Sequence, residues 1–195
     1  MARATSKKKP DRVETAAVPA EALAGEFPKI ALPIKPPYPP MEARSVERIP
    51  GEGGWLYEPK WDGFRCLAFR KGKTLALQSK SGQPLDRYFP EMVEAFLALP
   101  LRAFVLDGEI VIRGEHGLDF DALLQRIHPA ESRIRKLARE TPASYQAFDL
   151  LVDGKGKSVA GLPLGERRQR LETLFETIPE GGPIHLSPAS PDREV

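Results

Sequence analysis

The sequence has little cysteine, little histidine and no long apolar run, and each shortage excludes a class of protein. A single cysteine, Cys66, cannot form an internal disulfide, which excludes a disulfide-stabilised scaffold. The three histidines have no cysteine or second histidine at metal-ligand spacing, so we assign them no role. No stretch of about twenty apolar residues occurs, and the first residues lack the apolar core of a signal peptide. We therefore predict a cytoplasmic protein without a membrane partner.

The 195 residues, 41% hydrophobic and 29% charged, are ordinary for one globular domain. Five basic residues stand against one acidic residue in the first twelve positions, although the whole chain carries a formal charge of only +2. We predict that residues 1–35 form a disordered, basic and proline-rich leader and that residues 36–195 form the folded domain. The leader is either a solvated tail or a segment that attracts DNA phosphates.

The run Glu58-Pro-Lys60-Trp-Asp62-Gly63-Phe-Arg65 concentrates the groups that attack and hold a phosphate. A deprotonated lysine amine is a covalent nucleophile, and a carboxylate such as that of Asp62 suits a hard metal ion. The guanidinium of Arg65 offers a planar fork for a phosphate, and Gly63 allows a sharp turn. An Asp-Gly pair also predicts a β-hairpin, here between strands at 57–60 and 64–69, and both interpretations can hold together.

Three further segments follow in the chain. Ser79-Lys80-Ser81-Gly82 is a basic loop that follows a strand, and a merely solvated loop is the alternative. Period-two alternation within 104–112 places Asp107 and Glu109 on one face of a strand, unless Asp107-Gly108 is itself a hairpin turn. In the strand-like run 145–151, Phe148 is either a core residue or a surface on which a base could stack.

The order and spacing of these four segments resemble those of the covalent nucleotidyltransferases, which comprise ATP-dependent DNA ligases, RNA ligases and mRNA capping enzymes. The stretch 117–129 further resembles bacterial DNA ligases of the end-joining repair type. This resemblance implies an α+β fold with mixed or antiparallel sheets flanked by helices, as in part of an ATP-grasp-like adenylation domain. It favours a DNA ligase over the capping or RNA-ligase alternative. A preference for ATP over GTP would separate a ligase from the capping option.

The resemblance also implies a mechanism and a set of site residues. Lys60 would attack the α-phosphate of ATP and form lysyl-AMP, the AMP would pass to the 5′-phosphate of a DNA nick, and the 3′-hydroxyl would seal the strand. Asp62 would lie near a Mg²⁺ or Mn²⁺ ion. The residues expected to bind the nucleotide are Glu58, Lys60, Arg65 and Lys80 (phosphate or ribose for the last two), Glu109 (ribose) and Phe148 (adenine). Lys80 stands where the family usually has arginine, so it keeps the charge but loses the bidentate fork.

Two later ligase motifs, a Glu-Gly pair followed by lysine and a pair of lysines, do not occur before Val195. The OB-fold that follows them in the family is not expected either. The sequence thus predicts the first part of an adenylation domain that acts on nicked or broken double-stranded DNA, with end-joining repair proteins as further partners. A catalytically inactive remnant that binds nucleotide or DNA is the alternative from another class.

Helical periodicity predicts three helices around these motifs. One begins at Pro90 and buries Met92 and Phe96, and another is capped by Asp119. The third spans about 165–177 and places three arginines opposite its apolar side. We interpret that arginine face as solvated, with DNA contact as the alternative.

Overall fold

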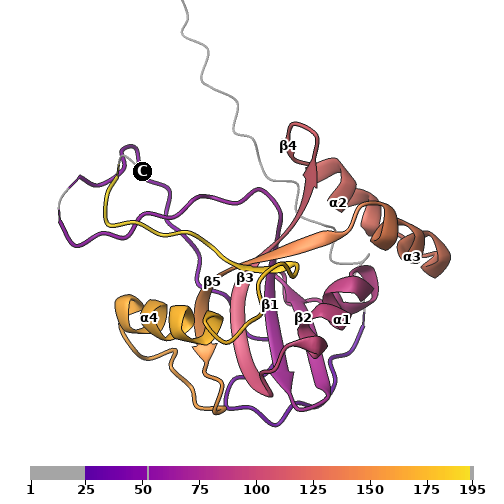
Figure 1. Cartoon of the computed structure of the whole chain (residues 1–195), viewed down its shortest axis with the longest axis horizontal. Coiled ribbons are helices and arrows are strands. Elements are labelled where there is room, and N and C mark those ends of the chain that lie inside the picture. The colour runs from indigo at the N-terminus through magenta and orange to yellow at the C-terminus, as the bar shows by residue number, and fades with distance from the viewer. Residues whose placement is uncertain (1–24, 52, 194–195) are drawn as a thin grey trace, which may run out of the picture.

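A mixed sheet forms the centre of the computed structural model, which describes residues 25–51 and 53–193 (Figure 1). Its strand order is β2 (Thr74–Ser79), β1 (Phe64–Lys71), β3 (Ala103–Gly114), β5 (Ala143–Val152) and β6 (Ile184–Leu186), and β4 (Gly117–Leu118) pairs with the end of β3. Only the β5–β6 pair is parallel within this described sheet. The predicted α+β class with a mixed sheet is confirmed.

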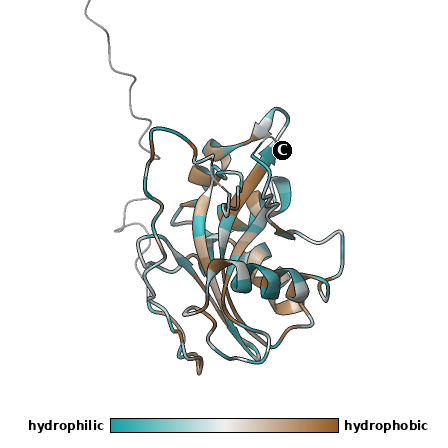
Figure 2. Ribbon diagram, turned by 90° about the vertical axis from the view of Figure 1, so that its left-hand side faces the viewer, coloured by the Kyte–Doolittle hydropathy of each residue, from teal (hydrophilic) through white to brown (hydrophobic). Residues whose placement is uncertain are grey.

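Helices cover one face of the sheet. They are the single turn η2 (Asp86–Tyr88), α1 (Pro90–Ala98), α2 (Phe120–Arg126), α3 (Glu131–Glu140) and α4 (Leu164–Phe175). Their buried apolar residues join those of the strands in one core, and Figure 2 shows hydrophobic residues concentrated along the strands. Pro90 begins α1, and Asp119 caps α2 by accepting a 2.8 Å hydrogen bond from the Ala122 amide, so both predicted helix starts are confirmed. No helix in the described part of the chain is long and apolar enough to cross a membrane.

An extended segment covers the opposite face. Ile30, Leu32 and Ile34 are buried there, against a second core that includes Leu67 and Phe69 of β1. The alternation of these three apolar residues explains the packing, because it directs them all to the same side of an extended chain. We predicted a disordered leader up to residue 35, but Ile30, Leu32 and Ile34 pack on the sheet, so the predicted end of the leader is wrong. Residues 1–24 of that leader lie outside the described residues.

Neither Asp-Gly pair forms a hairpin turn. Asp107 and Gly108 lie inside the continuous strand β3, which pairs with β1 on one side and with β5 on the other. Residues 57–60 are not a strand, because Tyr57 makes only an isolated bridge to Ser190 and β1 begins at Phe64. Both hairpin interpretations are therefore wrong, and long-range pairing across the sheet has overridden the local turn signal.

The fully buried side chain of Arg126 ties the helical layer together. Its Nη2 donates to both carboxylate oxygens of Glu91 at 2.5 and 2.6 Å, and its Nε donates to the carbonyl of Tyr88 at 3.2 Å. Its Nη1 donates to the carbonyl of Thr141 at 3.2 Å, so one guanidinium joins α1, α2 and the C-terminal end of α3. A buried charge of this kind is tolerated because every side of it is hydrogen-bonded.

We expect Arg126→Met to lower the free energy of unfolding by about 3–5 kcal/mol, because it leaves the Glu91 carboxylate without its cation and two carbonyls without their donor in a buried site. Arg135→Met is the matched control, since Arg135 pairs with Glu131 on the exposed side of α3 and should change stability by less than about 1 kcal/mol. Urea denaturation of both variants measures the difference. Equal losses would contradict the role given to Arg126.

Candidate active site

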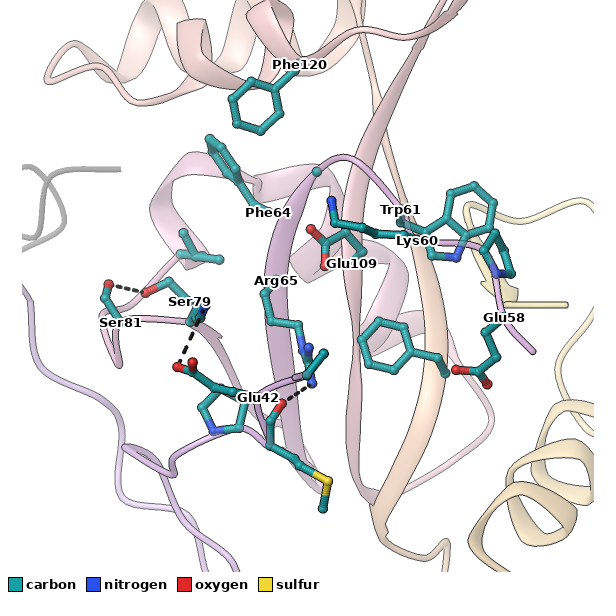
Figure 3. Close-up of a pocket in the computed structure, with 18 residues that line it drawn as sticks. Glu42, Glu58, Lys60, Trp61, Phe64, Arg65, Ser79, Ser81, Glu109 and Phe120 are labelled. Atoms are coloured by element: carbon teal, nitrogen blue, oxygen red, sulfur yellow. Dashed lines mark hydrogen bonds and ion pairs between the residues drawn. The ribbon is translucent and has the colours of Figure 1, made fainter. Parts of the chain in front are cut away.

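A pocket of about 750 Å³ opens beside the start of β1 (Figure 3). Its walls come from the lysine loop, from the loop after β2, from β3 and β5, and from the segment that precedes the lysine loop. All six residues predicted to bind the nucleotide line it: Glu58, Lys60, Arg65, Lys80, Glu109 and Phe148. Residues up to ninety positions apart in the sequence are therefore brought around one cavity of a size that suits a small-molecule ligand.

Lys60 lies in the exposed loop immediately before β1, and its amine points toward the carboxylate of Glu109 (Figure 3). The strand pairing explains this approach, because Phe64 is opposite Ile110 and Arg65 is opposite Glu109 in the β1–β3 register. The side chain that enters the pocket is thus an amine, a group that is nucleophilic when deprotonated, and a carboxylate from the neighbouring strand faces it.

Glu109 is a carboxylate in an unusual environment. Burial raises its pKa to about 7; the positive charges of Arg65 and Lys60 oppose this rise, while Asp107 and Asp62 add to it. Within the described residues, no group makes a hydrogen bond or close ion pair with this carboxylate. A partly desolvated acceptor without a partner at the pocket wall is available to a ligand.

Arg65 is held by its neighbours. Its Nε and Nη2 donate to the two carboxylate oxygens of Asp107 at 2.6 and 2.7 Å, and Nη2 also donates to the carbonyl of Met41 at 3.3 Å. Its guanidinium lies over the ring of Phe148, 4.6 Å from the centroid. Burial raises the pKa of Asp107, although Arg65 opposes that effect. The predicted fork of Arg65 is thus already used by Asp107, and only Nη1 is left for a phosphate or ribose.

Asp107 and Glu109 share a face of β3, as predicted, because Asp107 pairs with Arg65 and Glu109 is the residue opposite Arg65 in the β1–β3 register. The sequence pattern did not show, however, that these two carboxylates have different surroundings. Asp107, 3% exposed, is a partner of Arg65, whereas Glu109 faces the pocket.

Gly63 serves packing and not a turn. Its φ is not positive, but a Cβ at this position would collide with the carbonyl oxygen of Ile110 on β3. The glycine lets the lysine loop approach β3 closely, which corrects the reason that we gave for it from the sequence.

The segment Pro40–Ala43 is a wall of the pocket that the sequence did not indicate. Glu42 lies 3.7 Å from the amine of Lys80, and both side chains are exposed (Figure 3). Trp61 is a second such residue, because its indole Nε1 donates to the Ser187 hydroxyl at 2.9 Å and ties the lysine loop to the segment after β6. Neither contact has a local sequence signal, since each joins positions far apart in the chain.

Asp62, the predicted metal ligand, is exposed and does not line the pocket. Among the described residues there is also no group of three side chains that could hold a metal ion alone. Mg²⁺ is commonly bound by only one or two carboxylates together with substrate phosphates. Glu109 fits that requirement, because its carboxylate is unpaired and faces the amine of Lys60.

Two of the three arginines on α4 are buried, at 6% and 7% exposure, so the solvated face that we predicted is wrong. Arg167 forms a bidentate pair with Asp149 at 2.8 Å, and Arg168 lies 2.7 Å from Glu172 and 3.4 Å from Glu58. Only Arg170 is exposed among these three. The sequence missed these pairs because the two distant acidic partners, Glu58 and Asp149, belong to other elements.

The chain belongs to the ATP-dependent DNA ligase domain family, because residues 40–191 match the family described as "ATP dependent DNA ligase domain". DNA ligase C of Mycobacterium tuberculosis is 50% identical to it over 167 residues, which are 83% of this chain and 45% of ligase C. The multifunctional non-homologous end joining DNA repair protein LigD of that organism is 32% identical over 131 residues, 65% of this chain and 16% of LigD. The crystal structure of the LigD ligase domain matches with 27% identity and a TM-score of 0.49, over 69% of this chain and 39% of that one.

The family predicted from the four segments is therefore confirmed. The chain spans about half the length of the ligase C that it matches.

Proposed function

We propose that this chain carries out the nucleotide-transfer step of an ATP-dependent DNA ligase, with Lys60 as the nucleophile. The observation that carries the proposal is the pocket, in which the amine of Lys60 faces Glu109 and which is also lined by Arg65, Lys80 and Phe148. A lysine, two further cations, an unpaired carboxylate and an aromatic ring supply what a nucleoside triphosphate needs.

In this reaction the lone pair of the Lys60 nitrogen attacks the α-phosphorus of ATP, the bond to the β-phosphate oxygen breaks, and pyrophosphate leaves with that electron pair. The nitrogen loses a proton, and AMP remains bound to it through a phosphorus–nitrogen bond. Lys80 and the free Nη1 of Arg65 hold phosphate or ribose oxygens, and Glu109 accepts a hydrogen bond from the ribose. Phe148 presents its ring to the adenine, and Glu58 lies on the same side of the pocket.

A Mg²⁺ or Mn²⁺ ion held at Glu109, with Asp62 nearby, would reduce the negative charge that the phosphates present to the amine. The substrate of the complete reaction is nicked or broken double-stranded DNA, to which the AMP passes before the strand is sealed. Because LigD is named for end joining, end-joining repair proteins are the proposed partners. The proposed location is the cytoplasm.

The test is incubation of the protein with ATP and Mg²⁺ or Mn²⁺, followed by denaturing electrophoresis. Label in the α-phosphate should remain on the protein, whereas label in the γ-phosphate should leave with pyrophosphate. The same experiment with GTP distinguishes the capping-type alternative. Retention of the γ-label would contradict the proposal, and binding of ATP without any covalent label would support the inactive remnant instead.

A further inference from the structure

Helix α4 does not line the pocket, but two of its arginines form ion pairs with acidic residues on segments that do. Arg168 reaches from α4 to Glu58, which does line the pocket, and Arg167 reaches to Asp149, the neighbour of Phe148 on β5. The side chains of both arginines are only 8% exposed. One helix thus holds an acidic group on each of two segments that line the cavity, one through Glu58 and the other through Phe148.

Glu58 needs such a partner because it stands in a partly desolvated position with another carboxylate nearby. Its side chain is 29% exposed, and burial raises its pKa, with Asp149 adding to the rise and Arg168 opposing it. The other charged groups around it are accounted for, since Glu172 contacts Arg168 and Arg167 is paired with Asp149. The Arg168 guanidinium is therefore the cation that favours the ionised form of Glu58 and holds its orientation.

We propose that Arg168 is a positioning residue for nucleotide selection, which keeps Glu58 as an ionised hydrogen-bond acceptor beside the base that Phe148 faces. An ionised carboxylate only accepts hydrogen bonds, so it matches the exocyclic amine of adenine and opposes the carbonyl oxygen at the same position of guanine. The inference rests on the proposed function, because it gives Glu58 and Phe148 the base of the bound nucleotide as their ligand.

Arg168→Met should raise the KM for ATP in the labelling reaction by about tenfold, which is the loss of affinity expected when one charge-assisted hydrogen bond is weakened. It should also reduce the preference for ATP over GTP and leave the labelling rate at saturating ATP nearly unchanged, because Lys60 is untouched. The acid limb of the pH profile for ATP should move to higher pH, since loss of the cation raises the pKa of Glu58. Arg168→Lys should restore part of the wild-type profile.

The controls separate positioning from simple destabilisation. Arg170→Met changes an exposed arginine on the same helix and should leave all these quantities unchanged. In a Glu58→Gln background the Arg168 substitution should have no further effect on KM, on base preference or on the pH profile. An Arg168→Met protein with a wild-type KM and base preference would overturn the inference, and so would equal effects with and without Glu58.

If wild-type protein forms the adduct and an Arg168 variant still selects ATP normally, only the positioning role of Arg168 is rejected. Wild-type protein that forms no lysine adduct removes the reaction on which both this inference and the proposed function rest.

Discussion

Replacing Lys60 by alanine should abolish covalent transfer of the labelled AMP group and leave the fold intact. The loss should be complete, because no other amine in the described pocket faces Glu109 as Lys60 does (Figure 3). The side chain is exposed in a loop, so the change in the free energy of unfolding should stay within about 0.5 kcal/mol. Denaturing electrophoresis measures the label, and urea denaturation measures stability.

Two lysine controls make this result specific. Lys73→Ala removes an exposed lysine from the turn between β1 and β2, outside the pocket, and should not change labelling. Lys80→Ala removes the second lysine of the pocket and should weaken ATP binding without preventing adduct formation. If label persisted in Lys60→Ala but disappeared in Lys80→Ala, Lys80 and not Lys60 would be the nucleophile.

Replacing Glu109 by glutamine should make the protein more stable and less active. The pKa of Glu109 is raised from 4.5 to about 7, chiefly by burial, so ionisation of this group costs folding free energy. In the wild type the protonated Glu109 favours the folded state, and this contribution to stability is complete below pH 4.5. It is lost as the pH rises through about 7. The variant does not titrate there, so its advantage grows across this interval and is constant above it.

One pKa unit corresponds to about 1.4 kcal/mol, so the advantage in unfolding free energy should reach at most about 3.5 kcal/mol at pH 8. Unfolding is measured at several pH values in buffer without divalent cations, which keeps metal binding out of the comparison. Labelling should fall by roughly ten- to hundredfold, as expected when a charged acceptor is lost. A variant that is less stable than wild type at pH 8 would show that the Glu109 carboxylate has a stabilising partner in the fold.

The parts of the molecule with a short-range signal were predictable. Pro90 and Asp119 start helices because a proline without an amide hydrogen and a capping carboxylate each act within one turn. The six pocket residues were found because their segments occur in a characteristic order, and each then lies on the pocket wall. The alternation around Gly108 correctly placed two carboxylates on one face of β3.

Contacts between distant segments could not be predicted in this way. The sequence shows Asp107 and Glu109 as similar acids, but only the pairing of β1 with β3 gives one of them to Arg65 and the other to the pocket. The same holds for α4, where a row of arginines looks like a solvated face until Glu58 and Asp149 are brought against it. Ile30 and Leu32 also seemed part of an unstructured leader, because the apolar surface that they cover is assembled only in the folded sheet.

Identification of the residue that carries AMP, and of the bond that holds it, decides whether Lys60 is the nucleophile. Protein incubated with α-labelled ATP and Mg²⁺ is digested, the labelled peptide is sequenced, and the stability of its linkage in acid and in alkali is compared. We predict label on Lys60 through a phosphorus–nitrogen bond that acid breaks and alkali leaves intact. Label on another residue, or a bond with the alkali sensitivity of an acyl phosphate, would contradict this prediction.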